Sequence, residues 1–70
     1  MSRTRFIPKV GTTYRNNGGG EYECIAIKSD GNAWMRNVVS GWTFLAHYVV
    51  MYESGAIEWD YSSDGFFFGG

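Results

Sequence analysis

The stretch from Trp42 to Tyr61 constrains the fold most, because it can form a complete two-stranded unit by itself. Its second arm, residues 57–62 (IEWDYS), alternates apolar and polar side chains, which is the period of a strand with one buried face. Its first arm is a longer apolar run over residues 44–52. The intervening segment ends at Gly55, which can adopt the positive φ that a tight turn requires. The stretch therefore predicts a β-hairpin.

Two registers of this hairpin place different side chains in the core. A two- or four-residue connection pairs Val50 with Trp59, so that the even positions from 42 to 52 face inward. A three-residue loop with a bulge at Gly55 shifts the pairing by one and pairs Val49 with Trp59 instead. We favour the first register, because every even position from 42 to 52 is apolar, whereas the odd positions from 43 to 53 include Thr43, His47 and Glu53.

The remainder of the chain also has the patterns of short strands and turns. Residues 1–9 contain the only proline and are expected to form an entry arm. Strands are predicted over residues 10–15, 21–28 and 33–39, with a glycine-rich loop between the first two. The tail, residues 62–70, contains a turn signal and three consecutive phenylalanines, which we expect to dock on the body as a last short strand.

The turn between the second and third of these strands also permits two registers. Asp30-Gly31 as a two-residue type I′ loop pairs Ile27 with Trp34. A three-residue loop over residues 29–31 moves Trp34 to the face of Cys24. We favour the two-residue loop, since Asp-Gly is a strong hairpin signal.

Five short antiparallel strands within one domain of 70 residues predict a small all-β barrel, because closure removes sheet edges and buries one face. An SH3-like barrel is the first choice. A five-stranded OB-like barrel and an open meander that dimerises are the alternatives.

Several short motifs are shared with a group of known sequences. They are Tyr14-Arg15-Asn16, Ser40-Gly41-Trp42-Thr43-Phe44, Ala46-His47, Tyr52, Gly55, Ile57-Glu58-Trp59 and Tyr61-Ser62. With these the chain resembles small uncharacterised proteins that prophages and mobile elements of Firmicutes encode. The resemblance implies a bacterial or phage origin, and it carries over no activity and no site residue.

Composition limits the classes of function. The net charge of −1 disfavours the broad electrostatic attraction that drives non-specific nucleic-acid or membrane binding. Cys24 is the only cysteine, so no intramolecular disulfide can form, and we expect a reducing, cytoplasmic location. The longest apolar run is far shorter than the roughly 20 residues of a membrane span.

We expect no catalytic residue, no metal ligand set and no cofactor, and therefore not an enzyme. The glycine-rich loop lacks the lysine that a phosphate-binding loop places after its glycines. Cys24 and His47 are the only potential nucleophile and base of a Cys-His pair, and a cysteine in mid-strand is usually a small buried hydrophobe. Glu58 and Asp60 share one strand face and fit the solvated side of a half-buried strand.

The function expected from the sequence is binding to another protein, of unknown identity. The chain has three Trp, five Tyr and five Phe, more than so small an interior can hold, so some must form an exposed contact surface or a homodimer interface. The two-residue turn at Gly31 predicts one such surface, which consists of Ile25, Ile27, Trp34 and Arg36. The alternative function is a single-stranded nucleic-acid or nucleotide binder, in which Trp34 and Arg36 act together with Arg15 and Lys28.

Overall fold

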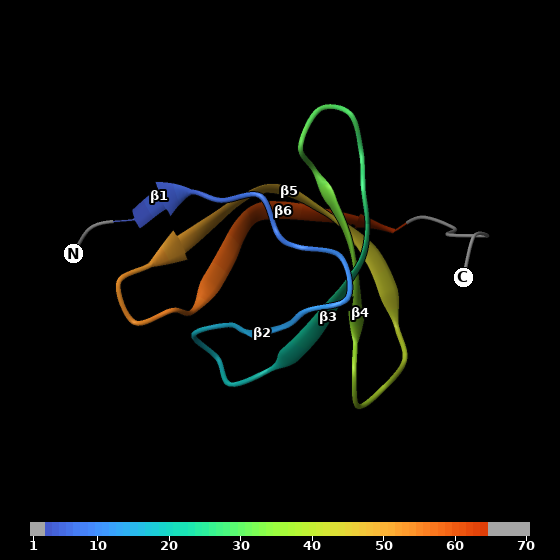
Figure 1. Cartoon of the computed structure of the whole chain (residues 1–70). Coiled ribbons are helices and arrows are strands. Elements are labelled where there is room, and N and C mark those ends of the chain that lie inside the picture. The colour runs from blue at the N-terminus through green and yellow to red at the C-terminus, as the bar shows by residue number, and fades with distance from the viewer. Residues whose placement is uncertain (1–2, 65–70) are drawn as a thin grey trace.

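A computed structural model describes residues 3–64 as a single antiparallel β-sheet (Figure 1). The six strands are β1 (Arg3–Arg5), β2 (Thr13–Arg15), β3 (Glu21–Ile27), β4 (Ala33–Asn37), β5 (Thr43–Tyr52) and β6 (Ile57–Asp64). No helix occurs over these residues, and hence none that could cross a membrane. The predicted docking of the tail falls on residues 65–70, outside the described part.

The sheet is a meander that curls into a half-barrel, which confirms the predicted small all-β barrel. Strands β2 to β6 follow one another as neighbours, and β1 pairs with β5 beside β4. The turn after β2 and the turn before β6 lie on the same side of the molecule (Figure 1). A single bridge between Asn16 and Ile57 joins them, and the amide of Asn17 donates to Glu58 Oε2 at 3.0 Å. The half-barrel is therefore joined at one end of its seam.

The strand β1 was not among the strands predicted from the sequence. The segment expected to be an entry arm contributes β1, in which Arg5 pairs with Val50. Phe6 follows it and packs against the core. The proline that argued against a strand is Pro8, which lies beyond the end of β1 and does not interrupt it.

Three hairpin turns share one geometry, and this geometry overturns both favoured registers. The amide of Gly31 donates to the carbonyl of Lys28, that of Gly55 to Tyr52 and that of Gly19 to Asn16. Each of the three glycines has a φ between 89° and 92°. These are three-residue loops in which only the glycine is left-handed. A two-residue type I′ loop would also force positive φ on the residue before the glycine, which is costly for a residue with a side chain.

The shifted registers change which residues are opposite one another. Val49 pairs with Trp59 and Met51 with Ile57, as the three-residue alternative at Gly55 predicts. Ala26 pairs with Trp34 for the same reason at Gly31. The register of β3 and β4 then changes once more at Ile25, between Cys24 and Ala26. This irregularity places Cys24, opposite Met35, in the core and leaves Ala26 on the outer face with Trp34.

A backbone kink at Tyr48 breaks the alternation along β5. Tyr48 is the only residue other than glycine with positive φ in the part of the chain described, at 59°. Before it, Phe44 and Ala46 are buried in the core, and after it, Val49 takes the inward position. The prediction that all even positions from 42 to 52 face inward is therefore wrong: Trp42 is 58% exposed and Tyr48 45% exposed.

The core lies on the concave side of the half-barrel, and strands β3 to β6 all contribute to it. Its buried members are Cys24, Ala33, Met35, Phe44, Ala46, Val49 and Ile57. Half-buried aromatic side chains pack against it, among them Tyr22 and Trp59. Phe6 and Tyr14 also pack against it, edge-on to each other with ring centroids 5.3 Å apart.

Candidate functional site: an aromatic pocket

Beside the rings of Tyr22, Phe44 and Trp59 the molecule has an open pocket of about 320 Å³. Its lining combines four aromatic residues with three small polar ones: Tyr22, Trp42, Phe44, Trp59, Asn37, Ser40 and Ser62. We call this the aromatic pocket. These residues come from β3, β4, β5, β6 and the β4–β5 loop, so the pocket exists only when the half-barrel is assembled.

The floor of the aromatic pocket is a rigid cluster of three rings. Tyr22 meets Phe44 and Trp59 edge-on, with ring centroids 5.5 and 5.2 Å apart. Phe44 and Trp59 are tilted at 40° with centroids 5.3 Å apart. Edge-to-face contacts of this kind are favourable beyond their buried area, so the floor needs no ligand to keep its shape.

Three polar groups of the aromatic pocket have no partner within residues 3–64. The hydroxyl of Tyr22 and the indole N–H groups of Trp42 and Trp59 make no hydrogen bond there, and no buried polar side-chain atom of this part is left unsatisfied. These groups are therefore accessible. A ligand that covers the rings can also accept hydrogen bonds from both indoles.

The β4–β5 loop presents further apolar surface beside the aromatic pocket. Val38 is 44% exposed and Val39 91% exposed. The loop is held by Asn37, whose Oδ1 accepts hydrogen bonds from the amides of Val39 and Ser40 at 2.9 and 3.0 Å. This capping ends β4 at Asn37, two residues before the predicted end of the strand. It also fixes the loop, so that its valines are displayed without a large cost in ordering.

The four residues predicted as a binding surface do not form one surface. Trp34 and Arg36 share the outer face of β4, opposite Leu45 and Thr43 of β5. Ile27 lies opposite the buried Ala33 and packs against the core. Ile25 is half-buried at the irregularity in β3. The grouping of all four depended on the two-residue turn at Gly31, while a binding role for Trp34 stays a prediction.

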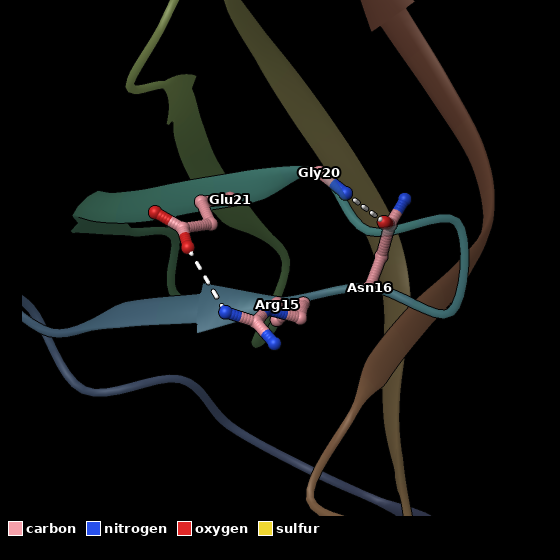
Figure 2. A network of polar contacts seen from close by, with 4 residues as sticks. All are labelled: Arg15, Asn16, Gly20 and Glu21. Carbon is pink, nitrogen blue, oxygen red and sulfur yellow. Dashed lines mark hydrogen bonds and ion pairs between the residues drawn. The ribbon is translucent and has the colours of Figure 1, made fainter.

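The basic residues of the predicted nucleic-acid surface are mostly engaged with acidic neighbours. Arg36 contacts Glu23 at 2.7 Å across the β3–β4 ladder. Figure 2 shows the same arrangement at the β2–β3 hairpin, where Arg15 contacts Glu21 at 3.2 Å. In the same view Asn16 turns its side chain back to accept from the amide of Gly20. The paired carboxylates cancel the positive charge that a phosphate backbone would require.

Reactive groups are few in the described part of the chain. Cys24 is fully buried, and burial raises the pKa of its thiol above the usual 9.0, which keeps it in the unreactive form. His47 is held on the outer face, where its two ring nitrogens contact Asn32 Nδ2 at 3.2 Å and Ser63 Oγ at 2.7 Å. No group of three or more metal-ligating side chains occurs between residues 3 and 64.

Only the composition of the sequence, and no motif, indicates the aromatic pocket. The excess of aromatic residues predicts that some are exposed, but Tyr22, Phe44 and Trp59 are brought together by register and curvature. Trp42 follows the turn at Gly41 and was assigned to the core face by alternation. A four-residue loop places it at the rim instead, because its carbonyl accepts from the amide of Asn37 at 2.9 Å and so closes the loop.

Comparison with protein-family models, with curated proteins and with solved structures finds no match to this chain.

Proposed function

We propose that this protein is a non-enzymatic binding module with an SH3-like half-barrel, and that it binds another protein through the aromatic pocket. The observation that carries the proposal is the open cluster of Tyr22, Phe44 and Trp59 with Trp42 at its rim. Interface centres are enriched in Trp and Tyr in partly enclosed pockets, where a few such residues supply most of the binding energy.

The chemistry of the lining indicates the class of ligand. Flat aromatic rings accept apolar side chains, and the indole N–H groups of Trp42 and Trp59, which have no partner within residues 3–64, can donate to backbone carbonyls of an extended peptide. Asn37, Ser40 and Ser62 form a polar rim around the rings. A segment with apolar side chains and exposed carbonyls, in extended or polyproline II conformation, matches these requirements.

A peptide-display selection against the 70-residue chain tests this proposal. Selected peptides are then measured against Trp42→Ala, with Tyr61→Ala as a matched control, since both rings are largely exposed and only Trp42 lines the aromatic pocket. We expect Trp42→Ala to weaken binding about 10- to 30-fold, the size of a hot spot, and Tyr61→Ala to leave it unchanged. Binding that is insensitive to Trp42 would contradict the assignment.

A second candidate function, single-stranded nucleic-acid binding, is favoured by one observation on the outer face. Arg5 lies over the ring of Tyr48 at 4.3 Å, and Tyr61 stacks on His47 with centroids 4.1 Å apart. Exposed stacked rings beside arginines are typical of sites that bind bases. Titration with an oligonucleotide at low and physiological salt distinguishes this candidate: it requires binding that weakens steeply with salt and that Tyr61→Ala abolishes.

A further inference from the structure

We propose that His47 is a pH switch for the aromatic pocket: the neutral imidazole holds the kink at Tyr48 through the side chain of Asn32, and protonation of His47 releases it. This inference rests on the proposed function, because it names how binding at the aromatic pocket is regulated. It depends on which atoms donate and which accept around Asn32.

The orientation of the Asn32 side-chain amide is fixed at both of its polar atoms. The backbone amide of Tyr48, which can only donate, lies 3.1 Å from Asn32 Oδ1. The carboxylate of Asp30, which accepts, lies 3.4 Å from Asn32 Nδ2. Turning the amide over would place two donors together at Tyr48 and two acceptors together at Asp30. The NH2 group of Asn32 is therefore the one that contacts His47.

This orientation selects one protonation state of His47. Asn32 Nδ2 lies 3.2 Å from His47 Nδ1, and since Nδ2 donates, Nδ1 must accept and carry no proton. The proton of the neutral ring is then on Nε2, which donates to Ser63 Oγ at 2.7 Å. A second proton on Nδ1 sets two donors against each other, and Asn32 cannot turn to relieve this without losing the amide of Tyr48. Both side chains are half-buried, so water replaces the lost hydrogen bond poorly.

The other groups around His47 include charges of both signs. Tyr61 of β6 stacks on the ring with centroids 4.1 Å apart, and the exposed Asp60 precedes it. Arg5 of β1 lies over the ring that follows His47 in sequence, and Asp30 lies in the β3–β4 turn. The arginine disfavours a cation at His47 and the two carboxylates favour one. The amide of Asn32 is the group that accommodates the neutral ring and opposes the protonated one by geometry.

The kink lies between the residues that form the floor of the aromatic pocket. Phe44 belongs to β5 before the kink, whereas Trp59 of β6 is opposite Val49, after the kink. The rings of Phe44 and Trp59 are in contact, with centroids 5.3 Å apart. A change of φ at Tyr48 therefore alters how these two rings meet, and with them the floor of the aromatic pocket.

The test follows the 70-residue chain by NMR and by peptide binding between about pH 8 and pH 5.5, the range in which histidine changes its charge. The backbone amide signal of Tyr48 reports on the kink, and the indole N–H signal of Trp59 reports on the aromatic pocket. We expect both signals to shift with the same midpoint as the imidazole signals of His47. The affinity for a selected peptide should fall about 3- to 10-fold with acid, the effect of losing roughly one hydrogen bond.

Two variants serve as controls with different expected results. His47→Phe keeps an aromatic ring at this position but cannot titrate, so the two NMR signals and the peptide affinity should not depend on pH in this range. Asn32→Asp still accepts from the amide of Tyr48 and also accepts from a protonated His47. In this variant acid should therefore strengthen peptide binding instead of weakening it. Circular dichroism at pH 8 checks that both variants are folded.

Two outcomes would overturn the proposal. One is that the signals of Tyr48 and Trp59 stay unchanged while His47 titrates, which excludes the coupling. The other is an acid effect of the same sign in Asn32→Asp as in the unmodified chain, which excludes the role of the Asn32 amide.

The same measurements separate this proposal from the proposed function, because the two NMR signals require no peptide. If selected peptides are insensitive to Trp42 while the signals of Tyr48 and Trp59 follow His47, the proposed function fails and the switch stands. If peptides require Trp42 but bind equally well at both ends of the pH range, the proposed function stands and the switch fails.

Discussion

The two halves of β5 lie in one strand with one continuous pairing to β6, yet they contribute opposite sets of side chains to the core cluster. In the first half Phe44 and Ala46 enter the core, and in the second half Val49 does. The other edge of β5 changes partner in the same place, from β4 to β1. One left-handed residue, Tyr48, therefore lets a single long strand serve two parts of the half-barrel.

The kink at Tyr48 is held from the β3–β4 turn. The amide of Tyr48 donates to Asn32 Oδ1 at 3.1 Å, and the Nδ2 of the same side chain contacts His47 Nδ1. Asp30 in turn accepts from the amide of Asn32 at 3.0 Å. The difference between the two halves of β5 therefore depends on a few polar contacts outside the core. Mutations can remove the core side chains, the kink or these contacts separately.

The largest effect is expected from Phe44→Ala in the first half of β5. Phe44 is 6% exposed and belongs both to the core and to the pocket floor, so its loss should destabilise the fold by about 3 to 5 kcal/mol. This approaches the total stability of a domain of this size. Urea denaturation followed by circular dichroism measures it. Thr43→Ala, of opposite parity, should cost less than about 1 kcal/mol; a similar loss for both would refute the assigned faces.

The second effect concerns the kink itself. Tyr48→Val should destabilise by about 1 to 2 kcal/mol, because a β-branched residue is strained at positive φ. Tyr48→Asn is the matched control, since asparagine tolerates the left-handed region, although it too loses the contact with Arg5. Thermal melts of the two variants give the difference. Equal melting temperatures would show that the contact with Arg5, and not the backbone, determines the effect.

Asn32→Ala tests the side-chain contacts that hold the kink at Tyr48. It removes the acceptor for the amide of Tyr48 and the neighbour of His47, at an expected cost of about 1 kcal/mol. Asn32→Asp retains the acceptor and should recover part of this loss. Backbone amide exchange at Tyr48, measured by NMR, should accelerate in Asn32→Ala more than at residues 44–46. Uniform acceleration along β5 would mean that the contact does not act locally.

The smallest effect is a loss of folding stability at alkaline pH that depends on Cys24. This residue pairs with Met35, next to the first half of β5. Burial raises its pKa in the folded state, so the unfolded chain releases its proton first as the pH rises. The contribution of the Cys24 thiol to the free energy of unfolding is therefore fully present below the ordinary pKa of 9.0 and decreases as the pH rises above it. Cys24→Ala should remove that part of the decline. Unfolding curves at pH 8 and above, compared between the two proteins, measure the difference.

Local patterns predicted the existence of most strands and of the turns between β2 and β6, because these depend on residues close in sequence. The turn at Gly11 was missed, since residues 10–15 were assigned to one strand and β2 covers only Thr13–Arg15. Local patterns did not predict the registers, since Glu53-Ser54-Gly55 and Ser29-Asp30-Gly31 each fit two loop lengths. Each turn has the three-residue loop, which requires positive φ only at the glycine, whereas a type I′ loop would require it at a second residue as well. The kink at Tyr48 had no local signal, because a side chain of Asn32, sixteen residues away, holds it.

The aromatic pocket was less predictable than the fold for a related reason. An excess of aromatic residues indicates that some ring surface is exposed, but not which rings meet. Tyr22 and Trp59 are distant in sequence and touch because β3 and β6 face each other across the curled sheet. Trp34 was grouped with Ile25, Ile27 and Arg36 because of one incorrect turn length, and its own binding role stays a prediction.

The three equal turns at Gly19, Gly31 and Gly55 also bear on the order of folding. Each joins strands that are neighbours in sequence, so the corresponding hairpins close short loops at a small entropic cost. The bridge from Asn16 to Ile57 and the pairing of β1 with β5 join distant segments and must close much longer ones. Such non-local contacts form late in folding, so the seam and the first strand should complete the structure after the hairpins have formed.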